Sequence, residues 1–463
     1  MAGAASGIGQ FYPKHVLPSP KPLRFPFNIS RLLTNNLSII PEEAYREPFV
    51  IAPGPPRMAF ITGPELVKVL LFDRPTEFPK GAVQVNVLRP IFGNAMLSQE
   101  GHEWRWQRGA AAPLFRHDEL VHFGSFMSAA AETTVAQWRR AAPGSVHVVQ
   151  KDMMRAAFNV ITNTMLAGGA DEIFDAIEKG HADYYAGINW WIIYTLFGLP
   201  HWLPRPGGRA MRAHERRLRD AVAELVRTRR DAAGADNDLL ARMLRAADPE
   251  TRQHMSEELV VDNIVSFLMA GYDTTALALT WTLYLISQSP DWETRMLEEV
   301  HQVAGSGPVT SGHVEKLKIV QQVVSESLRL FPTAPIIIRD FNEDVTLNGI
   351  LIPRGTIGII PIYAIHRHSK YWDDPHQFNP GRFARDDRSK LMRFQFMPFG
   401  VGPRICIGAA FAMLELTIML ATFVRAARFE IEPGFDPRPS GRMFLVPEAG
   451  MPMKVTIRAP RGH

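Results

Sequence analysis

The chain has 463 residues, of which 46% are hydrophobic and 21% charged, with a formal net charge of +4 and one cysteine. This composition is typical of a folded globular protein with a sizeable core, and it excludes general disorder. A lone cysteine excludes an internal disulfide framework. The small net charge, without any run of lysine or arginine, argues against nucleic acid as a partner.

The N-terminal residues 1–26 read MAGAASGIGQFYPKHVLPSPKPLRFP. They have neither the charged start and apolar core of a signal peptide nor the roughly 20 apolar residues of a membrane anchor. Residues 263–286 are more apolar, but Asn263 and Asp273 interrupt them. Because a carboxylate at the centre of a bilayer is costly, this stretch is interpreted as a buried core helix. We therefore expect no transmembrane anchor and a cytoplasmic location.

The pattern of hydrophobic residues divides the chain into helical and β-rich parts. Strand-like runs occur over about 45–63, and the pattern from about 64 to 330 is mostly helical. Between 335 and 362, β-branched runs alternate with Asn-Gly and Arg-Gly turns, as in a small sheet. A helix is expected over about 407–425, and strand-like runs return over 428–458. Because no repeat or linker separates these parts, the whole chain is expected to form one domain, mainly α with a smaller β region (α+β).

Two short motifs place charged side chains on helix faces. In GHEWRWQR, Trp104 and Arg108 are four residues apart and point in the same direction, and Arg108 suits a carboxylate. An amphipathic surface helix explains this motif equally simply. In SESLRLFP, Glu326 and Arg329 are three apart and can form an ion pair. Such a pair, if exposed, contributes little to stability.

The long apolar helix carries polar residues at its centre, in AGYDTT (270–275). We expect Ser256 to cap this helix and Pro290 to end it. A glycine, an aspartate and two threonines are unfavourable in a buried helix. Two interpretations remain open. The threonine bonds back to a carbonyl one turn earlier and Asp273 lies in a hidden ion pair, or Asp273 and Thr274 carry chemistry.

The single cysteine lies in FGVGPRICIG (399–408). A lone cysteine is usually an inert core thiol. Here, however, the glycines at 400, 402 and 408 permit backbone angles and close approaches that other residues do not. Arg404 and the start of the following helix favour either a thiolate or a paired carboxylate. One thiolate cannot build a zinc or iron–sulfur site alone, but it can be the sole protein ligand of an iron held by a porphyrin.

The spacing Phe399-x-x-Gly402-x-Arg404-x-Cys406-x-Gly408 resembles the haem-thiolate loop of the cytochrome P450 monooxygenases. The pair Asp273-Thr274 is similar to the acid–alcohol pair of that family. The remaining motifs follow in the family's order, from residue 101 to 415, and therefore cover most of the chain.

The two charged motifs also resemble motifs of this family. Glu326 and Arg329 match its Glu-x-x-Arg motif, whose arginine accompanies a further arginine, here Arg382 in FNPGRF. Gly381 departs from the acidic residue that is common at its position. The resemblance assigns these three charged residues a structural role that braces the cofactor region. Trp104 and Arg108 match the family's Trp-x-x-x-Arg motif.

The resemblance implies a fold in which a long central helix crosses over a buried haem b. Cys406 would be the axial ligand of the haem iron, Asp273 and Thr274 would deliver protons, and Gly271 would leave room for dioxygen. The implied cofactor-binding residues are Trp104, Arg108, Ala270, Gly271, Arg339, His366, Phe399, Gly400, Arg404, Cys406 and Gly408.

The implied reaction inserts one oxygen atom from O2 into an apolar substrate, by hydroxylation or epoxidation. Electrons would come from a separate ferredoxin or flavodoxin/reductase, which docks near Arg105, Arg116 and Arg404. The stretches 82–97 and 185–203 are expected to complete the substrate pocket; the latter also suits a membrane surface or ordinary core packing. The other expected pocket residues are Leu268, Met269, Tyr272, Ala334, Ile336 and Ile337.

Other classes of protein remain. A peroxide-driven peroxygenase or a haem-thiolate isomerase would share the cysteine loop, but Asp273 and Thr274 speak against both. A haem sensor without catalysis would be expected to carry an added signalling domain. A helical interaction protein with a buried cysteine would require every motif to be a coincidence. Finally, the segment PSPKPLRFP resembles the proline-rich segment that follows the anchor in membrane-bound relatives.

Overall fold

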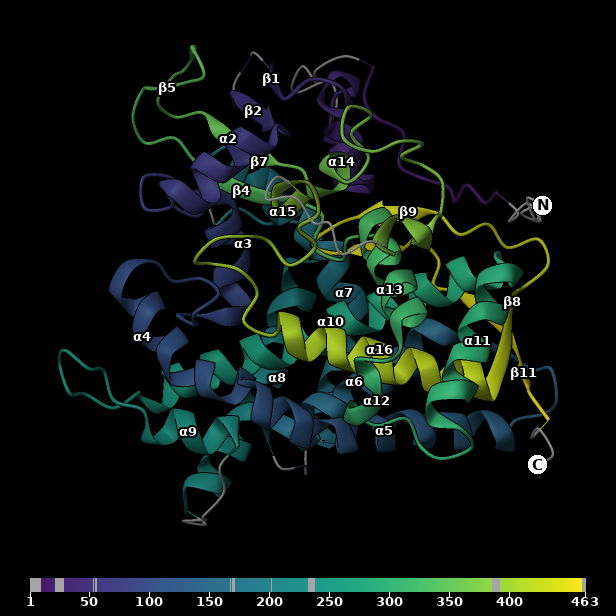
Figure 1. Ribbon diagram of the computed structural model, residues 1–463. Coiled ribbons are helices and arrows are strands. Elements are labelled where there is room, and N and C mark those ends of the chain that lie inside the picture. The colour runs from purple at the N-terminus through teal and green to yellow at the C-terminus, as the bar shows by residue number, and fades with distance from the viewer. Residues whose placement is uncertain are drawn as a thin grey trace.

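The computed structural model describes residues 10–20, 29–52, 54, 56–166, 168, 171–200, 202–231, 238–384 and 392–459. Helices make up most of the molecule, and a four-stranded sheet lies beside them, at the upper left of Figure 1. The expected mainly helical α+β class is therefore confirmed.

The longer helices form the body of the molecule. They are α3 (Ala82–Phe92), α4 (Gly101–Ala111), α5 (His117–Arg140), α6 (Val149–Met165), α7 (Asp171–Leu196), α8 (Gly208–Asp231), α9 (Leu239–Arg245), α10 (Glu257–Ser287), α11 (Pro290–Ala304), α13 (Lys318–Leu330) and α16 (Ala409–Ala426). Shorter helical segments are α1 (Ile29–Thr34), η1 (Asn36–Ile39), η2 (Glu42–Tyr45), α2 (Pro64–Lys68), η3 (Val69–Asp73), η4 (Ala112–Phe115), α12 (Ser311–Val314), α14 (Ile362–Ile365), η5 (Pro380–Phe383) and α15 (Met392–Gln395).

The strands pair within four small sheets. The largest has the order β1-β2-β7-β4, in which β2 and β7 are parallel and the other pairs antiparallel. A second sheet has the order β3-β11-β8, and two hairpins are formed by β5 with β6 and by β9 with β10. The strands are β1 (Phe49–Ala52), β2 (Met58–Ile61), β3 (Val146–Val148), β4 (Ile337–Asp340), β5 (Val345–Leu347), β6 (Ile350–Ile352), β7 (Ile357–Ile360), β8 (Ala427–Ile431), β9 (Pro439–Gly441), β10 (Leu445–Pro447) and β11 (Pro452–Ile457).

Most strands lie where the sequence pattern predicts them, but β3 was missed. It has only three residues, lies within the predicted helical body and pairs with β11, which is about 300 residues later. Its first and last residues, Val146 and Val148, are exposed. A strand of this kind is formed by a distant partner rather than by its own hydrophobic pattern.

Helix α10 crosses the centre of the molecule, behind α16 in Figure 1. As expected, the side chain of Ser256 caps it by accepting a hydrogen bond from the N–H of Leu259, at 3.2 Å. Glu257 and Glu258 lie in the first turn, where a carboxylate is favourable. The helix is buried along most of its length, which supports the interpretation as a core helix.

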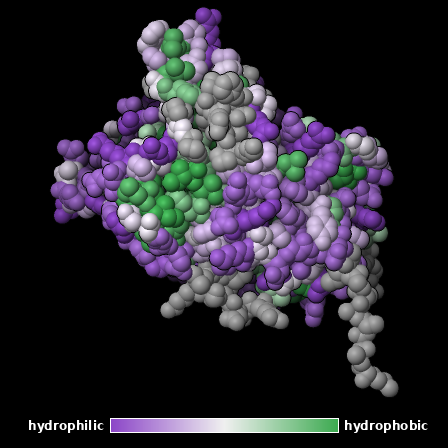
Figure 2. Space-filling view, turned by 90° about the horizontal axis from the view of Figure 1, so that it is seen from above, coloured by the Kyte–Doolittle hydropathy of each residue, from purple (hydrophilic) through white to green (hydrophobic). Residues whose placement is uncertain are grey.

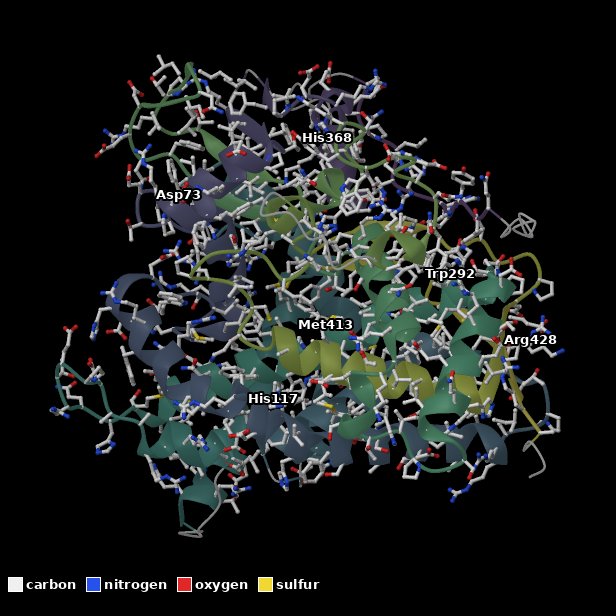
Figure 3. All side chains as sticks on the ribbon, in the orientation of Figure 1. Asp73, His117, Trp292, His368, Met413 and Arg428 are labelled. Atoms are coloured by element: carbon white, nitrogen blue, oxygen red, sulfur yellow. The ribbon has the colours of Figure 1, made fainter. Side chains whose placement is uncertain are left out.

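Helix α16 follows the cysteine loop and runs from the middle of the molecule toward its edge, between the labelled Met413 and Arg428 in Figure 3. Among the described residues, only this helix is long and apolar enough to cross a membrane, yet 61% of its apolar window is buried within the protein. Because most of this apolar stretch is buried, α16 is interpreted as a core helix.

The surface seen from above is mostly hydrophilic, with hydrophobic residues gathered in a patch near the left of Figure 2. Single exposed apolar side chains, such as Leu351 on β6, are normal for a soluble surface. A contiguous apolar patch with a polar rim is instead typical of a region that receives a ligand or a partner.

Candidate functional site

The loop that carries Cys406 is held by its own backbone. The N–H of Cys406 donates to the carbonyl of Phe399 at 2.9 Å, and the N–H of Ile405 donates to the carbonyl of Gly402 at 3.1 Å. Gly408 then caps α16. Phe399, predicted as a cofactor contact, therefore also closes the loop through its carbonyl group. These bonds fix the sulfur at the point where the loop becomes a helix.

Glycine is required in this loop for a reason that the sequence does not reveal. Gly402 has φ = +79°, and a Cβ there would lie 1.8 Å from the carbonyl oxygen of Leu71 in η3. The close approach is thus made to the chain itself rather than to a cofactor. Gly400 also has a positive φ, of +71°, but Gly408 has an ordinary φ of −90°. Of the three glycines, Gly408 therefore does not use the backbone freedom that glycine permits.

The thiol of Cys406 is exposed, although protein surrounds it closely enough for desolvation to raise its pKa above 9.0. The N–H of Gly408 and the charge of Arg108 both act to lower this pKa. Arg404 plays a different part, because it pairs with Glu100 and donates to the carbonyl of Pro75 at 3.2 Å. Of the two outcomes expected for Arg404, pairing with a carboxylate is the one found.

Four cations gather beside this loop: Lys80, Arg108, Arg339 and Arg404. Desolvation lowers the pKa of Lys80 to about 8, Glu100 raises it, and the three arginines lower it further. Arg339 is only 6% exposed, and desolvation followed by Arg404 lowers its pKa to about 10. Within the described residues its Nε has no hydrogen-bond partner. The four cations surround a single carboxylate, that of Glu100, and the buried Arg339 is incompletely hydrogen-bonded. Such a surplus of positive charge fits a ligand with carboxylate groups.

Trp104 and Arg108 lie together on α4, as their spacing predicts. The guanidinium of Arg108 is 5.8 Å from the centre of the Trp104 ring, and that of Arg404 approaches the same ring at 5.8 Å. Arg108 also donates to the carbonyl of Ile405 at 3.0 Å, one residue before the cysteine. The pair therefore belongs to the cysteine loop and not to an ordinary surface helix.

One face of α10 is open, although the helix is otherwise buried. Its open positions are Phe267, Ala270, Gly271 and Thr274, which follow the spacing of a single helix face. The ring of Phe267 stacks on that of Phe115 at 6.1 Å, and a Cβ at Gly408 would lie 3.6 Å from the Phe115 ring. The open face of α10 therefore borders the cysteine loop.

The acid–alcohol pair lies at this open face. The Thr274 hydroxyl donates to the carbonyl of Ala270 at 2.7 Å, as the structural interpretation of the motif expects. Thr274 remains half-buried, so its oxygen still faces the open space, whereas Asp273 is buried. The hydrogen bond to Ala270 satisfies the Thr274 hydroxyl within the helix and also fixes its orientation. The interpretation of Thr274 as a structural residue is therefore compatible with a role in chemistry.

Three expectations for α10 need correction. Leu268, Met269 and Tyr272 are buried and do not line the open space, because they lie on other faces of the helix. The ring of Tyr272 packs against Phe158 of α6, with ring centres 6.1 Å apart. Gly271 serves helix packing, since a Cβ there would lie 2.7 Å from Cδ1 of Ile161. Its small size therefore accommodates α6, while the residue remains half-buried on the open face, and room for dioxygen there stays a prediction.

The segment before β4 agrees better with expectation. Ala334 is exposed, and Ile336 and Ile337 are half-buried. A Cβ at Gly400 would lie 3.7 Å from Cδ1 of Ile337, so this segment also borders the cysteine loop. This segment, like the open face of α10, therefore lies beside the loop of Cys406.

Glu326 and Arg329 form a buried pair, joined by bonds of 2.6 and 2.7 Å. The Nε of Arg382 lies 3.5 Å from the same carboxylate. The predicted structural group is thus assembled.

His366 does not face the open space. Its Nδ1 lies 3.2 Å from the carbonyl oxygen of Arg329, and its Nε2 accepts a hydrogen bond from the N–H of Met397 at 3.0 Å. Burial, followed by the charge of Arg329, lowers its pKa to about 3. Both ring nitrogens are occupied by the backbone, which corrects the expectation that His366 contacts a cofactor.

Among the described residues, no group of three or more histidine, cysteine or acidic side chains could hold a metal ion. A metal at Cys406 would therefore need to bring its other ligands with it, as a porphyrin iron does. The accessible desolvated thiol and the surplus of cations fit a haem with its two carboxylates. The fold and the site thus define a haem-thiolate protein.

Comparison with known proteins agrees with the conclusion that this is a haem-thiolate protein. A family profile described as Cytochrome P450 matches residues 19–455. Pentalenene oxygenase of Streptomyces avermitilis is 30% identical over 407 residues, which cover 86% of this chain and 87% of that protein. Cyclooctat-9-en-7-ol 5-monooxygenase of Streptomyces melanosporofaciens is 29% identical, covering 82% of each chain. A cytokinin hydroxylase of Arabidopsis thaliana is 27% identical, covering 96% of this chain and 91% of its own.

The chain belongs to the cytochrome P450 family. It is a haem-dependent monooxygenase that uses O2, an organic substrate and electrons from a redox partner. Sequence reasoning missed one member of the cation cluster, Lys80, because the short segment FPKG carries no recognisable motif.

Sequence reasoning also missed Glu415 on α16, whose only signal was a carboxylate within an apolar helix. Its side chain is 2% exposed, and Thr275 donates to its Oε2 at 3.3 Å. Within the described part of the chain its Oε1 has no hydrogen-bond partner. Burial raises its pKa from 4.5 to about 8. The carboxyl group is therefore neutral at pH 7 in the folded protein.

Replacing Glu415 with glutamine is expected to remove a pH dependence of stability. Because the folded pKa is raised, the contribution of Glu415 is complete below pH 4.5 and is lost as pH rises toward 8. The free energy of unfolding of the wild type should fall on the order of 3 kcal/mol more than that of the variant between pH 5 and 8. Urea unfolding at both pH values measures this, with the exposed Glu298→Gln as control. Parallel pH profiles for wild type and Glu415→Gln would contradict it.

Proposed function

We propose that this cytochrome P450 hydroxylates or epoxidises an apolar, hydrocarbon-rich substrate, with haem b as its cofactor. The observation that carries the proposal is the open face of α10. Phe267, Ala270 and Gly271 make that face apolar, and Thr274 supplies its one hydroxyl group. The neighbouring Ala334, Ile336 and Ile337 are also apolar. A largely apolar lining with one placed polar group selects an apolar molecule.

The names of three relatives support this substrate class. Matching proteins are named for oxidation of pentalenene, cyclooctat-9-en-7-ol and 11-oxo-beta-amyrin. We infer that a molecule of this general kind, mostly carbon and hydrogen, is the substrate here.

In this proposal the bound haem supplies the iron chemistry that activates dioxygen. Cys406 would hold the iron as a thiolate, and the N–H of Gly408 and the charge of Arg108 would stabilise the negative charge of the sulfur. Arg108 and Arg339 bind the carboxylates of the cofactor. Thr274, oriented by the carbonyl of Ala270, passes protons from Asp273 to the oxygen side of the site.

The proposed electron donor is a ferredoxin or a flavodoxin/reductase with an acidic docking surface. Arg105 and Arg116 are exposed, and Arg105 also lines a surface hollow of about 680 Å³ together with Arg242 and Arg245. Arg404 is less suited to docking than expected, because its charge is paired with Glu100. The cytoplasmic location remains a prediction.

A reconstituted reaction tests the proposal. Purified protein receives a ferredoxin and its reductase, apolar substrates and isotopically labelled dioxygen. We expect labelled oxygen in the product, and we expect hydrogen peroxide without the donor to give much less. Unlabelled product, or faster turnover with peroxide, would instead favour the peroxygenase alternative.

Thr274→Ala should then separate electron consumption from product formation. Because no hydroxyl would direct protons to the oxygen side, product formed per electron pair should fall about ten-fold or more. Thr274→Ser, which keeps the hydroxyl, is the matched control and should retain most of the yield. The ratio of product to NADPH consumed is the measurement. An unchanged ratio in Thr274→Ala would remove Thr274 from the proposed role.

A further inference from the structure

Asp262 lies two turns before Ala270 on α10 and is 1% exposed. Its Oδ2 accepts a hydrogen bond from the N–H of Asn94 at 2.7 Å. Its Oδ1 lies 2.6 Å from the guanidinium of Arg219 on α8, in a charge contact rather than an aligned hydrogen bond. Gly93 makes room, since a Cβ there would lie 2.3 Å from Oδ2 of Asp262. A buried carboxylate thus fixes the turn that follows α3.

The next residue, Asn263, holds the same turn from α10. Its Oδ1 accepts from the N–H of Met96 at 3.1 Å, and its Nδ2 donates to Gln107 at 2.9 Å. Gln107, the neighbour of Arg108 on α4, donates in turn to the carbonyl of Asn94 at 3.3 Å. We call residues 93–99 the clamped turn, because α10 and α4 bind its backbone from both sides.

The clamped turn also binds Lys80. The Nζ of Lys80 donates to the carbonyls of Met96, Leu97 and Gln99 at 3.2, 2.8 and 2.8 Å. Its backbone N–H donates at 2.9 Å to Glu100, the carboxylate that pairs with Arg404. Lys80 also forms an isolated β-bridge with Arg339. The turn therefore connects Asp262 with the cation cluster beside Cys406.

We propose that Asp262 is a positioning residue for the cofactor: it holds the clamped turn in the shape in which three carbonyls bind Lys80. Lys80 then keeps Arg339 and the Glu100–Arg404 pair in place for the carboxylates of haem. Groups that orient the ligands of a cofactor affect its retention almost as much as the ligands themselves. The inference rests on the proposed function, because it assumes that the cation cluster binds haem.

The experiment measures haem loss from the ferric holoenzyme to excess apomyoglobin, followed by absorbance. Asp262→Ala should lose haem about ten-fold faster than the wild type, and Asp262→Asn should lie between them. The matched control is Glu257→Ala. Glu257 also joins α10 to α8, through Arg230 at 2.6 Å, but this pair is exposed, at 37% for Glu257 and 51% for Arg230. Its haem loss should equal that of the wild type.

A double variant separates positioning from general loosening. Lys80→Met breaks the last contact of the path, so Asp262→Ala and Lys80→Met together should lose haem no faster than the faster single variant. If the two effects multiply, or if Asp262→Ala behaves as Glu257→Ala does, the inference is overturned. Should Asp262→Ala fail to fold, the same cycle with Asp262→Asn gives the answer. A wild type that binds no haem defeats the proposed function itself, whereas unchanged loss from a haem-bound variant defeats only this inference.

Discussion

Replacing Cys406 with serine is expected to abolish the far-red-shifted Soret band of the reduced, carbon monoxide-bound protein, and all monooxygenase turnover with it. A serine hydroxyl does not ionise in the physiological range, so it cannot replace a thiolate as the ligand that favours O–O cleavage. The hydrogen bond from the backbone N–H of residue 406 to the carbonyl of Phe399 does not involve the side chain and should survive the change. The loop should therefore keep its shape, and the loss should be chemical rather than structural. The reduced carbon monoxide difference spectrum measures it.

The matched control removes a different sulfur. Met413 lies seven residues after Cys406, in the second turn of α16, and is labelled in Figure 3, so Met413→Leu tests whether the sulfur of this residue takes part. Its spectrum should match that of the wild type. A red-shifted band that persists in Cys406→Ser would falsify the assignment of the axial ligand. A protein that shows no haem band at all, when expressed with ample haem, would contradict haem binding altogether.

Residues whose role depends on local spacing were predictable from the sequence. Ser256 caps α10 through a bond to a residue three positions later, and Glu326 meets Arg329 within one helical turn. The cysteine loop is similar, because its key bonds join residues within about ten positions of each other. Short-range geometry of this kind follows from the backbone alone.

Residues whose role depends on distant partners were not predictable. Asp262 binds Arg219 from another helix and the turn at Asn94, which is 168 residues away in sequence. The ammonium group of Lys80 is held by carbonyls of the same turn. Nothing in the neighbouring sequence of either residue specifies these partners. Their environment exists only after the helices have packed.

The substrate lining illustrates a third kind of limit. Apolar residues occur all round the centre of α10, so hydrophobicity does not show which face is open. The structure answers this through packing: Tyr272 meets Phe158, and Gly271 meets Ile161, both on α6. Ala270 and Thr274 consequently face the open space. The rotation of the helix, and not its composition, selects the lining.

Replacing Arg329 with methionine is expected to destabilise the protein more than any other change of a single ion pair considered above. Arg329 and Glu326 are both fully buried. The guanidinium also donates to the carbonyls of His366, Pro375 and Gln377, at 2.8, 2.7 and 3.0 Å. Methionine would leave the buried carboxylate without its closest cation, with Arg382 at 3.5 Å and the N–H of Asn379 at 2.8 Å still beside it, and three carbonyls without this donor. Loss of one partner of a buried pair costs about 3–5 kcal/mol in the free energy of unfolding.

Two variants show that burial, rather than the pair itself, causes this loss. Arg74 and Glu77 have the same i,i+3 spacing but are 41% and 51% exposed, so Arg74→Met should change stability far less than Arg329→Met. In the double variant Glu326→Leu/Arg329→Met both charges of the pair are removed together, and part of the stability should return. It should not return fully, because the carbonyls that Arg329 served still lack that donor. Urea unfolding of the haem-bound proteins gives all three values. If Arg329→Met costs no more than Arg74→Met, the buried pair does not brace the cofactor region.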